Sequence, residues 1–554
     1  MPASPLPTAA AGRFGGRWRF FLVVFAATLV PMLLWSIASP LMSVPDEPSH
    51  AVRAASVVRG EIAAIPWEQD QSLIVAHVPE YVANTHNLRC FAFEPDVTAA
   101  CQNAHRSDGT RIVATGTSAN LNSPAYYAVV GWPTLLLDGD AALYAMRLVN
   151  ALLCAATLAV MFMCLRALPR NRWATVGAVV GVTPMVLYLG GSINPNGIEV
   201  AASGALLAAL LVAVRTTVAG RRLWELTILA MIAAALVMST RSIALLWVAL
   251  IVVAALVLAS PGRLVRLLRT PAGWTLLAGS AVVGLASVWW YLHPPIFPAV
   301  VSEPVGPAAL ALVFVFTLTR TAEFFFGMIG YFGWVDTPAP NVTVAVWSTA
   351  ILALLATALI WSRARARFAV WGAIAVCVLV PAVTQVAVYQ AAGYMWQGRY
   401  TLAVLLCALL LAGIALDDDE SFPSPARAKR LVAVGYGALA VGSVWAFVWT
   451  LRRYVIGEGA PLETMLSHPQ WQPPIPWVPL TALYAVAIAG ATMFAARSFR
   501  PDASAEHAMH GDTASASSPT HAGAALPDTE LSGSPIRISG APVTAVVSPD
   551  DELI

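Results

Sequence analysis

Apolar stretches long enough to cross a lipid bilayer recur along the whole chain, and this feature constrains the fold most. A membrane-spanning helix needs about 20 consecutive, mostly apolar residues, and we identify about twelve such stretches. They cover residues 19–43, 141–166, 173–191, 198–217, 223–240, 242–260, 273–291, 342–361, 368–390, 400–416, 430–450 and 477–496. We therefore predict an all-α polytopic membrane protein with about twelve transmembrane helices.

The composition excludes the other broad classes of protein. Of the 554 residues, 58% are hydrophobic and 11% are charged, whereas soluble domains carry roughly a quarter charged residues. A soluble enzyme, a disordered protein and a disulfide-stapled secreted domain are therefore excluded. The 32 basic and 30 acidic residues nearly cancel, so nucleic acid is not indicated as a partner. The partner that the sequence predicts is the membrane lipid bilayer.

Basic residues cluster in alternate connections between the apolar stretches, and this pattern predicts the topology. Cytoplasmic loops carry an excess of lysine and arginine. With about twelve spans and both termini in the cytoplasm, every cluster falls on the cytoplasmic side. The clusters are Arg13/Arg17/Arg19, Arg166/Arg170/Arg172, Arg215/Arg221/Arg222, Arg263/Arg266/Arg269, Arg363/Arg365/Arg367, Arg427/Lys429/Arg430 and Arg497/Arg500.

The same pattern divides the chain into three parts. Residues 1–18 form a cytoplasmic N-terminal segment, and residues 19–496 form the transmembrane domain. Residues 497–554 switch to Ala, Ser, Thr, Pro, Asp and His. A segment of this composition cannot bury enough apolar surface to offset the entropy lost on ordering. We therefore predict a disordered cytoplasmic tail.

Two outer loops are long, the first over residues 44–140 and the fourth over residues 292–341, and loops of this length are usually functional. Each contains an apolar stretch, at 124–137 and 305–330. A full span at either place would move the later arginine clusters to the outer side. We therefore expect interfacial or re-entrant helices at both places.

Two of the six cysteines, Cys90 and Cys101, lie in the first outer loop with ten residues between them. The space outside the cytoplasm permits disulfides, and the spacing matches no zinc motif. We therefore predict a disulfide between Cys90 and Cys101. The other cysteines lie in or beside apolar stretches, where cysteine behaves as a small hydrophobe.

The first outer loop begins with two adjacent carboxylates, Asp46 and Glu47, directly after the first span. Pro48 suits the first turn of a helix, which would place an acid near the positive end of that helix. His50 and Arg53 would then share a face of it. The four side chains can converge as a general base or metal-binding acid beside a cation that holds phosphate. A helix cap with a structural histidine is the alternative.

Arginines at the outer ends of later spans are the next candidates for substrate binding. Arg241 lies where two apolar helices turn back, a costly position unless the side chain reaches water or binds an anion. Arg399, beside Tyr400, enters the tenth span and suits a phosphate, with an interfacial anchor as the alternative. Further candidates are His293, Asp336 and the pair Arg320 and Glu323.

Four stretches carry a family resemblance in the order in which they occur. They read Pro45-Asp46-Glu47-Pro48-Ser49-His50, Ser192-Ile193-Asn194-Pro195-Asn196-Gly197, Gly330-Tyr331-Phe332-Gly333-Trp334-Val335-Asp336-Thr337 and Gln397-Gly398-Arg399-Tyr400. They resemble the signature stretches of the uncharacterised bacterial membrane family catalogued as domain of unknown function 2142, over roughly residues 20–450. The arrangement as a whole, with a first span that leads straight into an acidic loop, resembles the GT-C superfamily of polyprenyl-phosphate-sugar-dependent glycosyltransferases.

The GT-C resemblance implies a sugar donor linked to polyprenyl phosphate and transfer to a cell-envelope glycan or lipid acceptor. The reaction would occur on the extracytoplasmic side of the bacterial cytoplasmic (inner) membrane. The acid of the superfamily's first loop matches Asp46, with Glu47 as the alternative, and Arg241 and Arg399 match its phosphate-binding cations by position only. Some members use a divalent cation and others none. Because Asp46 and Glu47 are adjacent rather than arranged as Asp-x-Asp, no cofactor is firmly implied.

Two other functions fit the sequence less well. A transporter or flippase places polar sites near the bilayer midplane, on broken helices. Here the charges crowd the outer interface, and Glu199 and Glu323 are the nearest exceptions. The pattern favours an inverting glycosyltransferase. A flippase, or a non-catalytic assembly protein for lipid-linked envelope glycans, remains the alternative.

Overall fold

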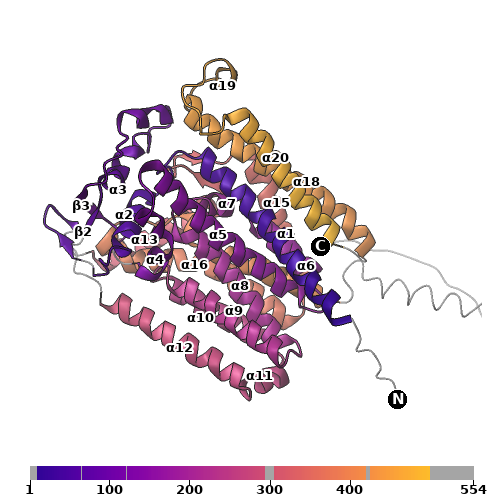
Figure 1. Ribbon diagram of the computed structural model, residues 1–554. Helices are drawn as coiled ribbons and strands as arrows, with labels where there is room; N and C mark the ends of the chain where they lie inside the picture. The colour runs from indigo at the N-terminus through magenta and orange to yellow at the C-terminus, as the bar shows by residue number, and fades with distance from the viewer. Residues whose placement is uncertain (1–8, 64, 120–121, 294–304, 420–424, 500–554) are drawn as a thin grey trace, which may run out of the picture. The chain divides into compact units, whose positions relative to one another are not determined.

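Long apolar helices make up most of the computed structural model, which describes residues 9–63, 65–119, 122–293, 305–419 and 425–499 (Figure 1). The chain up to Arg500 forms one unit. The predicted tail, apart from residues 497–499, lies outside the described residues, and so do the first eight residues of the predicted N-terminal segment. The protein is a multi-pass membrane protein of mostly helical structure.

Within the described residues, eight helices are long and apolar enough to span a membrane. They are α1 (Ala9–Ala38), α5 (Gly139–Arg166), α8 (Pro195–Arg215), α12 (Pro271–Leu292), α15 (Asn341–Trp361), α16 (Ala364–Ala392), α18 (Pro425–Ile456) and α20 (Trp477–Ser498). Two bent pairs raise the number to ten if each pair is one span. The pairs are α6 (Arg172–Gly181) with α7 (Pro184–Gly190), bent by 65°, and α13 (Pro307–Thr319) with α14 (Thr321–Gly330), bent by 50°.

Nine of the twelve predicted spans correspond to these eight helices and to the pair of α6 and α7. The other three correspond to helices outside this count. α9 (Arg221–Met238) carries two arginines and a glutamate in its first five residues. α10 (Ala244–Val257) and α17 (Leu402–Asp417) have 14 and 16 residues, fewer than the roughly 20 that a bilayer requires. All three nevertheless lie where a span was predicted, and α11 (Pro261–Leu268) connects α10 to α12.

Although α17 is short, its two ends contact opposite ends of the helix bundle. Arg399, just before it, contacts Asp46, the residue that precedes α2 (Glu47–Val57). At its other end, the Asp417 carboxylate accepts hydrogen bonds from the backbone N–H groups of Trp173 and Ala174, at the start of α6. Every residue of α17 is buried, so this helix lies in the core of the bundle.

Basic residues predicted to be cytoplasmic gather at the end of the bundle remote from the first long loop. Arg166, at the end of α5, lies 4.6 Å from the centre of the Phe20 ring near the start of α1. Arg215, at the end of α8, pairs with Asp418 just beyond α17. Arg166 and Arg215, from two of the clusters that led to the topology prediction, therefore lie at the same end of the bundle.

The first long loop contains a small sheet, which the sequence analysis did not predict. Strands β1 (Pro66–Trp67), β2 (Asp70–Pro79) and β3 (Ile112–Thr117) form an antiparallel sheet in the order β1-β2-β3. Alternate residues of β2, Ile74, Ala76 and Val78, are buried, as expected for a strand with one face against a core. This face packs against α2 (Glu47–Val57), which follows α1 directly.

Short helices complete this loop. They are α3 (Glu80–Ala83), the 3₁₀ helices η1 (Asn84–Arg89), η2 (Ala99–Ala104) and η3 (Trp132–Leu135), and α4 (Pro124–Gly131). A disulfide joins Cys90 and Cys101. α4 packs closely on α2. The absence of a side chain at Gly131 allows this, since a Cβ there would lie 2.2 Å from the Ala54 carbonyl oxygen. The side chains of Trp132 and Leu135 remain exposed, as an interfacial segment requires.

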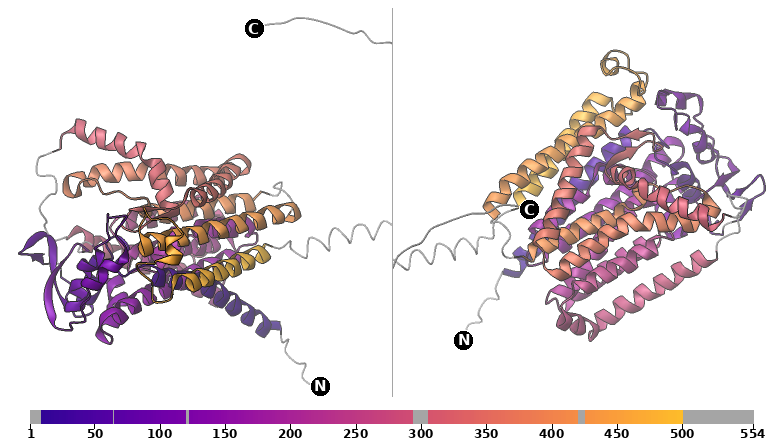
Figure 2. Two further views of the ribbon diagram at one scale, coloured as in Figure 1. Left: turned by 90° about the horizontal axis from the view of Figure 1, so that it is seen from above. Right: turned by 180° about the vertical axis from the view of Figure 1, so that it is seen from behind.

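The second long loop contains the bent pair of α13 and α14 and a two-stranded hairpin, β4 (Tyr331–Phe332) with β5 (Thr337–Pro338). A bent pair of this kind is either a broken span or a re-entrant loop, so the re-entrant or interfacial structure of residues 305–330 stays a prediction. The 3₁₀ helix η4 (Gly398–Tyr400) leads into α17, and α19 (Thr464–Ser467) lies between α18 and α20. α20 contacts both α1 and α18, and Figure 2 shows it beside α18 in both views.

Candidate functional site

The residue at the start of α2, Asp46, has a left-handed backbone conformation with a φ of 66°. Such a conformation is uncommon for residues other than glycine, although aspartate tolerates it. The side chain does not cap α2. Instead, its Oδ2 accepts a hydrogen bond of 2.6 Å from Arg399 Nη2. The carboxylate of Asp46 is 48% exposed, whereas the Arg399 side chain is 2% exposed.

This ion pair dominates the electrostatics of Asp46. Burial by itself raises the pKa of the carboxyl group, but the charge of Arg399, helped by His50 and Arg241, outweighs it. The pKa of Asp46 therefore lies below its usual value, and the group is ionised at neutral pH.

A second arginine, Arg241, lies near the Asp46–Arg399 pair, because both arginines contact the ring of Tyr400. The Cζ atoms of Arg399 and Arg241 lie 5.2 Å and 4.6 Å from the centre of the Tyr400 ring, within the range of cation–π attraction. Arg241 also donates hydrogen bonds of 3.0 Å and 2.6 Å to the Glu199 carboxylate. The structure thus gathers Asp46, Arg399, Tyr400 and Arg241, which lie far apart in the sequence.

A cavity of about 220 Å³ lies beside Arg399. At its polar side, Arg320 Nε donates a 2.6 Å hydrogen bond to Glu323 Oε2. The other lining residues come from the segment before α2, from α7 and α14, from the hairpin, and from the segment that leads into η4. They are Pro45, Met185, Phe324, Gly327, Tyr331, Val335, Tyr394, Met395, Trp396, Gln397 and Gly398.

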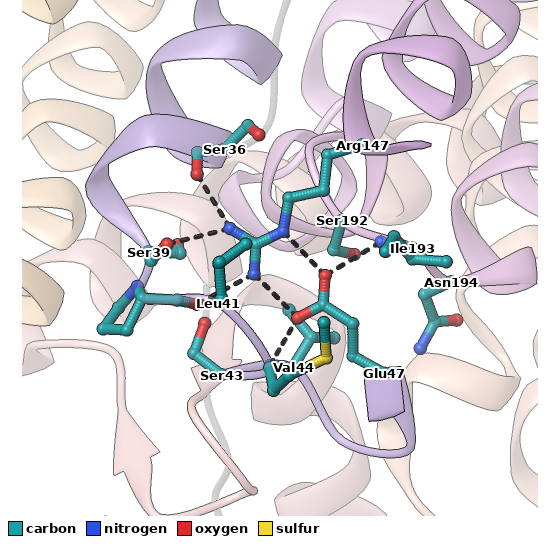
Figure 3. Close-up of polar contacts among 12 residues, drawn as sticks. Ser36, Ser39, Leu41, Ser43, Val44, Glu47, Arg147, Ser192, Ile193 and Asn194 are labelled. Carbon is teal, nitrogen blue, oxygen red and sulfur yellow. Dashed lines mark hydrogen bonds and ion pairs between the residues drawn. The ribbon is translucent and has the colours of Figure 1, made fainter. Parts of the chain in front are cut away.

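Glu47 has surroundings quite different from those of its neighbour Asp46. It is fully buried, and its two oxygens accept hydrogen bonds of 2.7 Å from Nε and Nη2 of Arg147 on α5 (Figure 3). Glu47 also accepts from the backbone N–H groups of Ile193 and Val44. Its carboxylate is occupied by these four hydrogen bonds. Glu47 is not among the residues that line the cavity, and neither is Asp46; Glu47 as the alternative base stays a prediction.

Arg147 completes this buried network. Its Nη1 donates to the carbonyl oxygens of Ser36 and Ser39, and its Nη2 donates to that of Pro40, each at 2.8 Å (Figure 3). These carbonyls belong to the end of α1 and the residues after it. The Glu47–Arg147 pair therefore fixes the junction of α1 and α2, on which Asp46 lies.

His50 and Arg53 share a face of α2, as predicted, but both side chains are buried. His50 Nδ1 lies 2.8 Å from the Tyr127 hydroxyl. Burial lowers the pKa of His50 to about 4, despite the opposing effect of the Asp46 charge, so the imidazole is neutral at neutral pH. Arg53 donates to the carbonyl oxygens of Glu61 and Ile62, which favours a structural role over the predicted binding of substrate.

His293 and Asp336, the other predicted binding residues, do not line the cavity. His293 Nδ1 lies 2.8 Å from the carbonyl oxygen of Trp289, one turn earlier in α12. Asp336 accepts hydrogen bonds from Trp334 N and Thr337 Oγ1 within the β4–β5 turn, and from Phe93 N in the first loop. The contacts of Asp336 hold the turn against the first loop.

Sequence reasoning missed Arg147 and Trp396. An arginine within the apolar helix α5 is itself a signal, because a charged residue in a span requires a partner. Trp396 directly precedes the Gln397–Tyr400 stretch and lines the cavity, but one tryptophan among 19 gives no signal of its own.

The described residues contain no group of three or more His, Cys, Asp or Glu side chains that could hold a metal ion. The two adjacent carboxylates pair with different arginines, Asp46 with Arg399 and Glu47 with Arg147. They do not form a shared ligand pair for the divalent cation considered from the sequence.

Fold and site together define a multi-pass membrane protein with a charged cluster at the end of its bundle that carries the long loops. The chain belongs to the family described as "Predicted membrane protein (DUF2142)", whose model matches residues 29–408. This range contains the four signature stretches and every residue of the cluster around Asp46 and Arg399.

Comparison with individual proteins adds two similarities. No curated protein matches the chain. Among solved structures, it is similar to ArnT from Cupriavidus metallidurans in the apo state, with 16% identity, a TM-score of 0.39, and coverage of 88% of this chain and 77% of that one. The same protein bound to undecaprenyl phosphate matches with 17% identity, a TM-score of 0.38, and coverage of 90% and 79%.

Proposed function

We propose that the protein is a membrane glycosyltransferase that takes a polyprenyl-phosphate-linked sugar as its donor. The acceptor is a glycan or lipid of the cell envelope, and the reaction takes place on the outer side of the bacterial cytoplasmic membrane. The observation that carries this proposal is the half-exposed Asp46 carboxylate paired with the buried Arg399 guanidinium beside a cavity. The resemblance of the whole arrangement, a first span that leads straight into an acidic loop, to the GT-C superfamily supports the same reaction class.

Arg399 has the properties required to hold the phosphate of the donor. A guanidinium group binds phosphate oxygens through two parallel hydrogen bonds. The Nε atom of Arg399 is buried and has no hydrogen-bond partner among the described residues. Arg241, on the same tyrosine ring, lies close by, with its charge balanced by the Glu199 carboxylate. The charge of Arg399 stabilises the lipid phosphate as it leaves.

Asp46 has the properties required of a general base. The acceptor hydroxyl transfers its proton to the Asp46 carboxylate while its oxygen forms a bond to the anomeric carbon of the sugar. The bond between that carbon and the phosphate oxygen breaks, and both electrons leave with the polyprenyl phosphate. When the phosphate occupies Arg399, Asp46 loses its ion pair, so its pKa rises and it becomes a stronger base. One carboxylate suffices because a phosphate leaving group needs little acid assistance.

The test measures donor binding and sugar transfer separately, using purified protein in nanodiscs, radiolabelled polyprenyl-phosphate sugars and an envelope extract as acceptor. Asp46→Asn should lower turnover by about 10²–10⁴-fold and leave donor binding nearly intact. Arg399→Lys should weaken donor binding, because an ammonium group cannot form the planar pair of bonds. Asp140→Asn is a matched control, since Asp140 forms only an exposed pair with Arg106.

Two results would contradict the proposal. Near-normal transfer by Asp46→Asn would remove Asp46 from the role of base. A wild-type protein that moves lipid-linked sugar across vesicles without transferring it would be the flippase considered from the sequence. The outer location is tested by a reporter active only outside the cytoplasm, which should be active at residue 100 and inactive at residue 520.

A further inference from the structure

Two residues that line the cavity beside Arg399 carry buried polar side-chain atoms that lack partners among the described residues. Trp396 is 6% exposed, and its indole Nε1 has no hydrogen-bond partner among the described residues. The same holds for Oε1 of Gln397, the next residue along the lining. Buried polar groups are nearly always hydrogen-bonded in folded proteins. One unused donor and one unused acceptor in adjacent lining residues therefore indicate a ligand that both accepts and donates hydrogen bonds.

The charged residues of the cavity favour a neutral ligand over an ionic one. Arg320 and Glu323 neutralise each other through their ion pair and remain 33% and 42% exposed. The Arg320 guanidinium also lies 5.0 Å from the centre of the Tyr394 ring. The pair therefore offers hydrogen-bond donors and acceptors without net charge. The one buried positive charge of the lining, Arg399, lies at the junction with Asp46.

The wall that carries Trp396 and Gln397 is held in place by its neighbours. The side-chain oxygen of Gln385, on α16, accepts 3.0 Å hydrogen bonds from the backbone N–H groups of Met395 and Trp396. Gly398 touches the opposite wall so closely that a Cβ there would lie 2.2 Å from the Phe324 carbonyl oxygen. A site fixed in this way requires little ordering when its ligand binds.

We propose that this cavity is the subsite for a single neutral sugar ring of the donor, and that Trp396 and Gln397 contact its hydroxyl groups. This proposal rests on the proposed function, since it takes the phosphate next to the sugar to lie at Arg399. Sugar hydroxyls both donate and accept hydrogen bonds, and the volume of about 220 Å³ is below the roughly 300–1,000 Å³ of pockets for drug-sized ligands. The volume of the cavity therefore suits one sugar ring.

The experiment compares the binding of undecaprenyl phosphate with that of its glucosyl, galactosyl, mannosyl and N-acetylglucosaminyl derivatives to the full chain in nanodiscs. At least one sugar-bearing lipid should bind about tenfold or more tightly than the bare lipid. Trp396→Phe, which removes the indole N–H together with part of the ring, and Gln397→Met, which removes the side-chain amide, should each reduce this advantage severalfold. Neither should change the binding of the bare lipid. Trp289→Phe, at an exposed position on α12, is the control.

The possible outcomes separate this proposal from the proposed function. If the bare lipid binds and Arg399→Lys weakens it, but none of the four sugars adds affinity, the sugar subsite is wrong and the phosphate site stands. An advantage that survives both Trp396→Phe and Gln397→Met also overturns the subsite. If no lipid binds, or if Arg399→Lys leaves the binding of the bare lipid unchanged, the proposed function fails and the subsite with it. Should one variant fail to fold, the other decides.

Discussion

The buried pair of Glu47 and Arg147 permits a quantitative prediction about stability. Arg147 is fully buried and donates to both Glu47 oxygens and to three carbonyl oxygens at the end of α1. Arg147→Met would leave Glu47 as a buried carboxylate with only two backbone N–H donors, those of Ile193 and Val44. Loss of one partner of a buried ion pair costs about 3–5 kcal/mol, because the remaining charge is uncompensated. We expect Arg147→Met to lower the free energy of unfolding by that amount.

A double-mutant cycle separates the pair from the rest of the network. Glu47→Gln keeps the shape of the side chain but removes its charge. In the double variant, no unpaired charge is left. Glu47→Gln combined with Arg147→Met should therefore cost less than the sum of the two single changes, by about 1–3 kcal/mol. Denaturant unfolding in mixed micelles measures all three variants.

A matched control comes from the exposed pair of Arg106 and Asp140 in the same part of the molecule. Exposed ion pairs contribute about 0–1 kcal/mol, so Arg106→Met should be nearly neutral. The reasoning is refuted if Arg147→Met costs no more than Arg106→Met, or if the changes at Glu47 and Arg147 simply add.

Three further predictions concern the regions around the site. Cys90→Ser should lower the stability of the first loop by about 2–4 kcal/mol, since the bond to Cys101 restricts the unfolded chain; cysteine alkylation without reductant that modifies both residues in the wild type would contradict it. Gly398→Ala should weaken donor binding more than tenfold, because the new Cβ forces α14 away from the cavity; unchanged binding would show that the wall yields. The pKa of His50 is about 4 in the folded protein and near 6.5 when exposed, so the unfolded chain binds the additional proton and stability falls as pH drops from 6.5 to 4. His50→Gln should flatten that pH dependence of unfolding, and an unaltered dependence would assign it to other groups.

The positions of the helices could be predicted from the sequence because hydropathy and charge act locally. Each apolar stretch became a helix, and Arg166 and Arg215 lie at a common end as the distribution of basic residues indicated. The number of spans was less predictable. The lengths of α10 and α17 and the 65° bend between α6 and α7 depend on packing against neighbours, which hydropathy does not report.

The candidate site shows where sequence reasoning ends. The acidic start of the first loop was identified, but its two carboxylates could not be told apart. Asp46 and Glu47 are adjacent and chemically alike, yet one is half exposed and the other fully buried. Their surroundings differ because the backbone is left-handed at Asp46 and because their partners, Arg399 and Arg147, come from distant helices. No residue near Asp46 and Glu47 in the sequence predicts which of the two carboxylates is exposed and which is buried.

The separation of these partners along the chain has a consequence for synthesis. Arg147 follows Glu47 by 100 residues, whereas Arg399 follows Asp46 by 353 residues. At about 5–20 residues per second, the ribosome adds Arg147 about 5–20 s after Glu47, but adds Arg399 about 18–70 s after Asp46. The junction of α1 and α2 can therefore be locked while most of the protein is still unmade. Asp46 lacks its ion-pair partner until the ribosome has added Arg399, the residue that leads into α17. A nascent chain that stops before residue 399 would keep the early scaffold and lack the site.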